Sequence, residues 1–301
     1  MKCIILGLDG LEYNIVEKFD FQALKQEEYG KIRIPRELYI EVSCEPYKNP
    51  VYEPWTPLIW FSFITGRFPS EEFKQDMEAL GVWNSNTLNN INKLMKKLIK
   101  LRLDDMSKIK KILELLGFRK RLPLTRDYNV PTIFDLTEKS IAIDVPTYTE
   151  NWPFGLEARP NENLRNFIDR ALNYELERFN FVKNKVLSLL EDDDWELLMM
   201  YSKLLDTFGE LSFNEKLISA YHMVNDFAKK IKTLVGDSSF ILIISDHGIE
   251  RMGKTTFGKH SDYGFYSSNI SLGLNTPKHT DFFNVIKKVI KANSREDLGF
   301  Q

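Results

Sequence analysis

Runs of apolar, β-branched residues alternate with longer amphipathic segments along the 301-residue chain. "KCIILGL" at residues 2–8 and "FILIIS" at residues 240–245 are almost wholly apolar, which is typical of strands buried on both faces. Further segments rich in apolar residues lie at residues 38–42, 140–145 and 195–201. The pattern therefore predicts five strands, with a late strand at residues 266–272.

Helical periodicity fills the intervals between the later strands. Residues 161–190 and 214–235 are amphipathic with a helical period, and residues 277–293 predict a closing helix. Strands separated by helices are joined by right-handed crossovers into a parallel sheet. We therefore predict an α/β fold, a mainly parallel sheet sandwiched by helices, as one domain over residues 1–301.

A further helix is predicted at "TPLIWFSFITG", with Pro57 at its first position and Thr56 at its N-cap. Thr56 has two readings, which stay open at this point. Its hydroxyl can simply cap the helix. Alternatively, a hydroxyl beside the exposed N–H groups of a helix N-terminus is well placed for a phosphate and a nucleophile.

Residues 81–130 form a predicted helical insertion, within which residues 89–121 are strongly basic. One interpretation is a solvated insertion whose apolar stripe packs on the body of the domain. The other is a cap that attracts an anionic substrate, or a surface that contacts anionic lipid or nucleic acid. We predict that the insertion is a cap over the site.

Composition narrows the class of protein. The formal net charge of −2 argues against specific nucleic-acid binding, and two cysteines do not form a disulfide framework. The apolar run at the N-terminus is too short for a secretory signal, and no stretch is long enough to predict a transmembrane segment. These features predict a cytoplasmic protein and indicate nothing about its oligomeric state.

Acidic residues and histidines follow the predicted strands. Asp9 comes after the first strand, and Asp246 and His247 come directly after "FILIIS". Open α/β sheets bind ligands beyond the carboxyl ends of their strands, so these positions share one edge. Taken singly, each residue also fits a turn, a cap or a structural histidine.

A second group follows residues 195–201. "LDTFGE" places Asp206 and Glu210 four residues apart, so on a helix both carboxylates lie on one face. His260 lies further on, in "KHSDYGFYS". Together the two groups offer enough oxygen and nitrogen ligands for two divalent cations.

In this order, "LGLDG", "TPLIWFSFITGRFP", "IDVP", "LDTFGE", "SDHG" and "KHSDYGFYS" resemble the motifs of one family. This family is the type I phosphodiesterase/nucleotide pyrophosphatase branch of the alkaline phosphatase superfamily, and the chain is most similar to the predicted phosphohydrolases of archaea. The resemblance covers nearly the whole chain. It implies a metal-dependent phosphohydrolase, and a phosphodiesterase in particular, acting on a small-molecule phosphate ester.

The resemblance also implies roles for individual residues. Thr56 would be the catalytic nucleophile. Asp9, Asp246 and His247 would hold one divalent metal, with Thr56 as a further ligand. The second metal would be held by Asp206, Glu210 and His260. The two ions would be zinc or manganese, with magnesium as a further candidate.

Three departures from the family keep alternatives open. Glu210 stands where the family usually has His, which favours manganese or magnesium over zinc at that site. Ile59 replaces an Asn that contacts phosphate in nucleotide pyrophosphatases, and residues 71–73 replace a His-Gly pair. The alternatives are a phosphomonoesterase or phosphotransferase of the same superfamily, or a non-catalytic binding protein with a degenerate metal site. A sulfatase is disfavoured, because the Cys/Ser-x-Pro-x-Arg motif is missing around Thr56.

Overall fold

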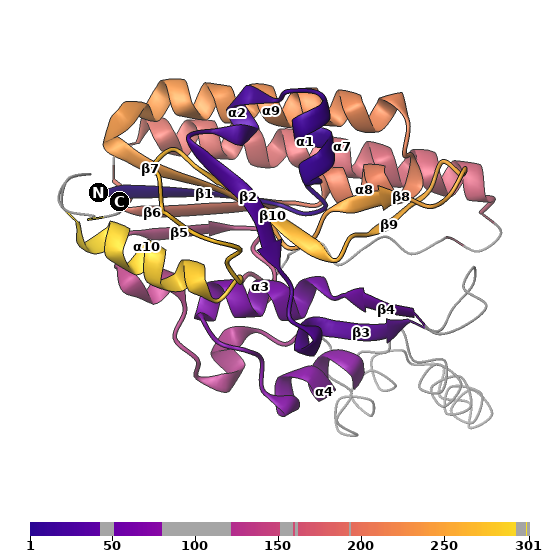
Figure 1. The fold of residues 1–301 in the computed structure, drawn as a ribbon. Helices are drawn as coiled ribbons and strands as arrows, with labels where there is room; N and C mark the ends of the chain where they lie inside the picture. Colours follow the sequence, from indigo (N-terminus) through magenta and orange to yellow (C-terminus); the bar gives the residue numbers. More distant parts are fainter. Residues whose placement is uncertain are drawn as a thin grey trace, which may run out of the picture.

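A six-stranded sheet forms the centre of the computed structural model, which describes residues 1–42, 51–79, 122–150, 159, 162–192, 194–292 and 299. The strand order is β2-β10-β7-β1-β6-β5 (Figure 1). The strands of this sheet are β1 (Lys2–Leu8), β2 (Glu28–Arg33), β5 (Ser140–Ile143), β6 (Leu197–Ser202), β7 (Ser239–Ser245) and β10 (Tyr263–Ser268). β5, β6, β1 and β7 are parallel, whereas β10 runs antiparallel between β7 and β2.

Two short hairpins complete the strands, namely β3 (Tyr39–Val42) with β4 (Val51–Pro54), and β8 (Ile249–Arg251) with β9 (Gly258–His260). The α-helices are α1 (Tyr13–Lys18), α2 (Gln22–Lys25), α3 (Thr56–Thr65), α4 (Glu71–Ala79), α7 (Leu164–Glu191), α8 (Leu204–Leu211), α9 (Glu215–Val235) and α10 (Asp281–Lys291). Short 3₁₀ turns are η1 (Arg36–Leu38), η2 (Thr125–Tyr128), η3 (Ile133–Leu136) and η4 (Gly236–Ser238).

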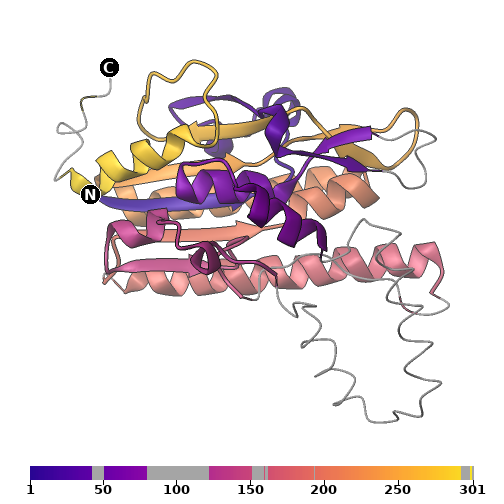
Figure 2. The ribbon, with the colours of Figure 1, turned by 90° about the horizontal axis from the view of Figure 1, so that it is seen from below.

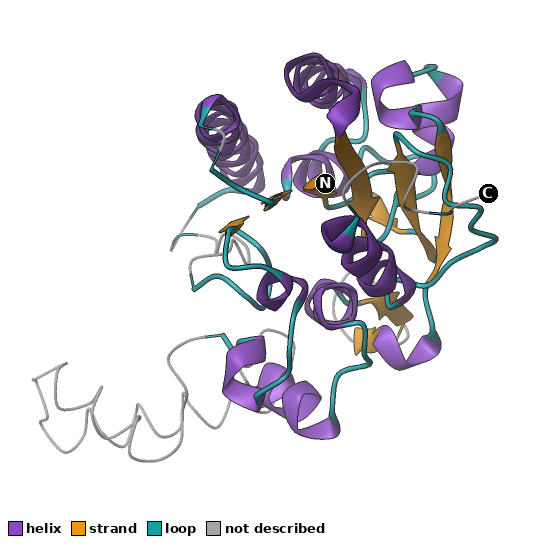
Figure 3. Ribbon diagram, turned by 90° about the vertical axis from the view of Figure 1, so that its left-hand side faces the viewer, coloured by secondary structure: helices purple, strands orange, loops and turns teal. Residues whose placement is uncertain are grey.

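Helices cover both faces of the sheet, as Figure 3 shows with the strands between them. α7 and α9 lie on one face, and α3 and α10 lie on the other, which Figure 2 views from below. Side chains alternate along each strand, so successive residues enter different cores. Ile4 and Leu6 of β1 join the core under α7 and α9, while Cys3 and Ile5 join the core under α3 and α10.

The predicted fold class is confirmed, as is the mainly parallel order of the sheet. β1 has the bounds expected from the apolar run, and β5, β6 and β7 lie within two residues of their predicted starts. The two long helices, α7 and α9, and the closing helix α10 also form where periodicity predicted them.

Three details of the sheet differ from prediction. Residues 38–42 give a strand, but β3 pairs antiparallel with β4 in a separate hairpin instead of entering the main sheet. β2 was not predicted, because "EYGKIR" combines charges with a glycine and lacks an apolar run. The late strand begins at Tyr263 rather than Tyr266, and it is antiparallel.

The basic stretch at residues 89–121 lies outside the described residues, as does most of the predicted insertion at residues 81–130. Its role as a cap therefore stays a prediction. Across the part of the chain that the structure describes, none of the helices combines the length and the apolar character needed to cross a bilayer.

Candidate metal centre

Strand alternation and register bring the strand-end residues together. In β1 the odd residues face α3, and in β7 the even residues do, so Asp9 and Asp246 continue the α3 face beyond each strand. Gly7 pairs with Ile244, which sets Asp9 and Asp246 side by side two residues later. α3 packs on this same face, and its first residue, Thr56, therefore lies at the same edge of the sheet.

The first cluster consists of Asp9, Asp246 and His247, which are fully buried. His247 Nε2 lies 3.3 Å from Asp9 Oδ1 and 3.5 Å from Asp246 Oδ2. The hydroxyl oxygen of Thr56 is 3.4 Å from the same nitrogen. The structure thus brings together all four residues that the family resemblance assigned to the first metal.

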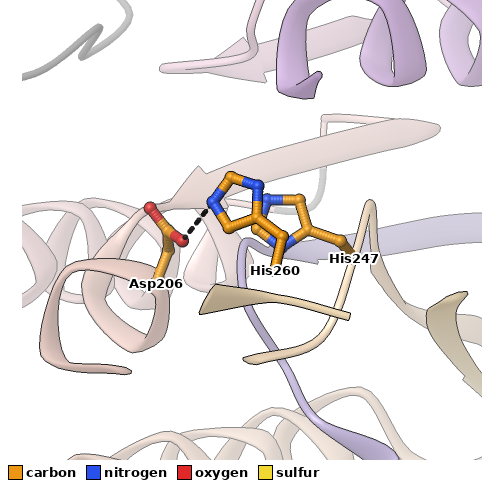
Figure 4. A group of neighbouring side chains, drawn as sticks. All are labelled: Asp206, His247 and His260. Carbon is orange, nitrogen blue, oxygen red and sulfur yellow. Dashed lines mark ion pairs between the residues drawn. The ribbon is translucent and has the colours of Figure 1, made fainter. Parts of the chain in front are cut away.

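The second cluster lies beside the first. His260 Nε2 is 3.2 Å from Glu210 Oε1 and 3.6 Å from Asp206 Oδ1 (Figure 4 draws the contact with Asp206). Asp206 and Glu210 come from α8, one turn apart as predicted, while His260 ends β9. The rings of His247 and His260 stack with centroids 3.7 Å apart, and His247 also offers a nitrogen within 4.8 Å of the ligand atoms of Asp206 and His260.

Both histidines direct the same nitrogen into the cluster. His247 Nδ1 lies 3.1 Å from the carbonyl oxygen of Gly248, and His260 Nδ1 lies 3.2 Å from that of Pro54. A carbonyl only accepts, so each Nδ1 carries the proton and donates it. In a neutral ring this leaves Nε2 unprotonated and facing the carboxylates, as in histidines that bind metals.

The buried oxygens provide a test of whether a cation fits. Asp9 Oδ1, Asp206 Oδ1 and both carboxylate oxygens of Asp246 are buried without a hydrogen-bond partner among the described residues. Buried carboxylates need hydrogen bonds, paired charges or a metal, because burial of an isolated charge is costly. Three of these oxygens, one from each aspartate, lie 3.3–3.6 Å from the two imidazole Nε2 atoms and form with them a donor set that suits divalent cations.

In the metal-free protein, the carboxylates of the first cluster resist ionisation. Burial, together with the negative charges of Asp246 and Asp206, raises the pKa of Asp9 well above its usual value. Burial also raises the pKa of Asp246 to about 6, although its polar contacts with Asp9 and Thr56 oppose the shift. Burial lowers the pKa of His247, so this imidazole is neutral. When ionised, the carboxylates of Asp9 and Asp246 are therefore like charges held close together, without enough positive charge nearby to balance them.

His260 and Glu210 behave in the opposite way. Burial disfavours the imidazolium, but the hydrogen bond to Glu210 and the charge of Asp206 outweigh it and raise the pKa of His260 to about 10. Burial likewise opposes ionisation of Glu210, yet the bond from His260 and the charge of Lys203 lower its pKa to about 2. Without a metal, the second cluster is therefore held together by an ion pair.

The predicted N-cap role of Thr56 is wrong. Trp55 has the extended backbone of the N-cap, and its carbonyl accepts the first helical bonds, from the N–H groups of Leu58 and Ile59. Thr56 is the first helical residue, and its half-buried hydroxyl faces His247. Because that hydroxyl does not cap the helix, the interpretation of Thr56 as only an N-cap is wrong.

Gly10 permits the close approach of the two clusters. Its φ of +75° suits glycine, and a Cβ there would lie 2.6 Å from the Cα of Asp206. The Asp9-Gly10 pair is therefore a turn, as one reading of the sequence held, and also the point where β1 meets α8.

Sequence reasoning missed two polar partners of the cluster, Tyr201 and Lys203. The hydroxyl of Tyr201 donates to Asp9 Oδ2, and Lys203 Nζ lies 3.3 Å from Asp206 Oδ2. The sequence feature that could have indicated them is "MMYSKLLD", in which Tyr201 and Lys203, two positions apart, place polar groups between the apolar residues of β6 and those of α8.

No protein-family model matches the sequence, and no curated protein matches it. The chain is similar to several solved structures. One is an alkaline phosphatase. It comes from the Antarctic bacterium TAB5 and is 13% identical, covering 97% of this chain and 98% of that chain with a TM-score of 0.48.

The murine ectonucleotide pyrophosphatase/phosphodiesterase 5 is 11% identical with a TM-score of 0.37, and the match covers 84% of this chain and only 59% of that one. The PH0037 protein from Pyrococcus horikoshii is 10% identical with a TM-score of 0.40, covering 96% and 97% of the two chains. Similarity this low does not identify a substrate.

Proposed function

We propose that the protein is a metal-dependent phosphohydrolase that cleaves phosphodiesters of small molecules, with Thr56 as its nucleophile. One observation carries the proposal. Three buried carboxylate oxygens without hydrogen-bond partners among the described residues lie 3.3–3.6 Å from the Nε2 atoms of two histidines, and a hydroxyl with no capping role lies 3.4 Å from one of those nitrogens. A site built only for stability would pair those oxygens within the protein.

Asp9, Asp246 and His247 would hold one divalent cation, with Thr56 beside it, and Asp206, Glu210 and His260 would hold the other. Two such ions neutralise a phosphate ester and stabilise the charges of the attacking and leaving oxygens. The second set has two carboxylates and one imidazole, so it favours manganese or magnesium over zinc.

The chain itself supplies the nucleophile and its orientation. Thr56 is held at the start of α3 by the packing of that helix against the sheet, with its oxygen at the edge of the first cluster. In the proposed reaction the Thr56 Oγ1–P bond forms while the ester P–O bond breaks and an alcohol leaves. Water then attacks the phosphorus, which releases the phosphate monoester and restores the hydroxyl.

The charges of the cluster favour a diester over a monoester. The carboxylates of Asp9, Asp206, Asp246 and Glu210 together balance two divalent cations. If only these ligands, the two cations and Lys203, 3.3 Å from Asp206, are counted, a single net positive charge is left; Glu53 lies behind the ring of His260, 3.9 Å from its Nδ1. A phosphodiester carries one negative charge at neutral pH, whereas a monoester carries close to two. The cluster thus complements the charge of a diester.

The test compares three chromogenic substrates on the purified protein after removal of metal and addition of Mn²⁺, Mg²⁺ or Zn²⁺. These are bis-p-nitrophenyl phosphate, p-nitrophenyl phosphate and p-nitrophenyl sulfate. We expect metal-dependent turnover with the highest kcat/KM for the diester. Thr56→Val preserves the shape of the side chain but should lower kcat by at least about a hundredfold, while Thr56→Ser should retain measurable activity.

Thr65→Val is the matched control, because Thr65 lies on the same helix and its hydroxyl donates to the carbonyl of Phe61. Its variant should keep the catalytic rate. A faster rate on the monoester would refute diester specificity. A protein that binds no divalent cation would refute the metal site itself, and near-normal turnover by Thr56→Val would refute the nucleophile.

A further inference from the structure

Two polar side chains lie beside the proposed metal ligands: Tyr201, near the end of β6, and Lys203, which follows the strand as the N-cap residue of α8. Tyr201 is buried, and its hydroxyl donates to Asp9 Oδ2. The Lys203 side chain is 21% exposed, and its ammonium nitrogen lies 3.3 Å from Asp206 Oδ2. Each of these contacts occupies one oxygen of a different carboxylate.

The other oxygen of each carboxylate is the one without a partner. Asp9 Oδ1 lacks a hydrogen-bond partner and faces His247 Nε2 at 3.3 Å. Asp206 Oδ1 also lacks one and faces His260 Nε2 at 3.6 Å. In both carboxylates, therefore, one oxygen is held by a donor from the junction of β6 and α8, and the other points into the cluster.

We propose that Tyr201 and Lys203 are positioning residues, which hold Asp9 and Asp206 so that each offers a single oxygen to a metal ion. This inference rests on the proposed function, because it takes both carboxylates as metal ligands. Neither residue needs to touch substrate. Asp246 has no donor of this kind, because its polar neighbours are Asp9, Thr56 and His247, which all belong to the first metal site.

The arrangement has a chemical consequence. A carboxylate whose second oxygen is bonded to a fixed donor cannot turn to bind a cation through both oxygens. The number of ligands around each ion then stays low, which leaves room for a phosphate oxygen. Residues that orient metal ligands in this way typically change metal affinity or activity by about 10–100-fold when they are removed.

Co²⁺ alone is the probe, because its visible absorption bands weaken as its coordination number rises. Tyr201→Phe removes one hydroxyl and keeps the ring that packs 5.4 Å from Trp60. Lys203→Met removes the donor at similar length, and Lys203→Arg retains one. We expect weaker bands for Tyr201→Phe and Lys203→Met and the wild-type spectrum for Lys203→Arg. Tyr201→Phe should also bind Co²⁺ about 10–100-fold more weakly.

Matched controls remove the same kinds of bond elsewhere. Tyr266 donates to Glu28 at 2.9 Å, and Lys25 is paired with two carboxylates, so Tyr266→Phe and Lys25→Met should leave the spectrum unchanged. Wild-type protein that binds two Co²⁺ ions, with folded Tyr201→Phe and Lys203→Met variants of unaltered spectrum and affinity, would overturn this inference alone. Wild-type protein that binds no Co²⁺ would overturn the proposed function as well.

Discussion

Binding of a metal to the second cluster should release a proton from His260. In the metal-free protein this imidazole has a pKa of about 10, because its hydrogen bond to Glu210 and the nearby charge of Asp206 outweigh its burial. At neutral pH the ring is therefore protonated on both nitrogens. A metal bound at Nε2 needs the neutral ring, so the cation must displace that proton.

The size of the effect follows from the pKa. Neutral pH lies about three units below it, and each unit corresponds to about 1.4 kcal/mol, so proton competition costs binding about 4 kcal/mol at pH 7. Apparent affinity for the second ion should then rise about tenfold per pH unit between pH 7 and pH 9. Protons held by Asp9 add to the release, because the pKa of that carboxyl is also raised.

Isothermal titration calorimetry with Mn²⁺, repeated in buffers of different ionisation enthalpy, counts the released protons directly. Glu210→Gln removes the charge that holds the imidazolium, so the pKa of His260 should fall. Fewer protons should then be released, and the affinity should depend less steeply on pH. Glu250→Gln is the matched control, because Glu250 lies on β8 and pairs only loosely with Lys259 at 3.9 Å.

Two results would refute this reasoning. Release of as many protons by Glu210→Gln as by the wild type would mean that Glu210 does not hold the proton on His260. An affinity of the wild type that stays constant between pH 7 and pH 9 would mean that the metal displaces no proton from His260. A lower affinity of Glu210→Gln would not decide the matter, since Glu210 is itself a proposed ligand.

Three further predictions concern stability and metal choice. The metal-free protein should melt at lower temperature as pH rises from about 6.5 to 10, because the pKa of His260 is raised to about 10 and the folded state therefore holds a proton that the unfolded state has lost. Calorimetry checks this, and excess Mn²⁺ should remove the trend. Glu210→His should shift preference toward zinc in a competition assay read by elemental analysis, because imidazole suits zinc better than it suits a hard cation. Gly10→Ala should lower the free energy of unfolding by more than about 1 kcal/mol and weaken metal binding, because a Cβ there would lie 2.6 Å from the backbone of α8. Gly253 has a similar positive φ but lies in open space, so Gly253→Ala should leave metal binding unchanged. Denaturant titration measures the stability of both variants, and calorimetry measures their metal binding.

Much of the fold could be predicted because its strands are buried on both faces. Such strands need continuous apolar runs, and β1 and β7 therefore stand out in the sequence. β2 lies at the edge of the sheet, where less burial is required and polar residues are tolerated, so "EYGKIR" gave no signal. The separate β3–β4 hairpin could not be recognised either, because a four-residue strand does not reveal its partner.

The residues of the site likewise divide into those that the sequence predicts and those that it does not. Acidic residues and histidines at strand ends are visible in a sequence, because the chain must leave the apolar run there. Lys203 and Tyr201 were missed, since their partners are determined by strand register and by side-chain length, and neither is visible in one sequence. The prediction that Thr56 is the N-cap was wrong by one residue, because helix starts are uncertain by that much in a sequence. In the structure the first carbonyl that accepts a helical hydrogen bond belongs to Trp55.

The ligands of the proposed centre are drawn from residues as distant in sequence as Asp9 and His260, and they meet only where β1, β6 and β7 lie side by side. A partly assembled sheet would offer no complete chelate, so the unfolded chain should have little affinity for the ions. Metal would then be acquired last, and its binding free energy would be added almost entirely to the native state. Metal content would accordingly report whether the whole sheet has assembled correctly, a record of folding that activity alone does not give.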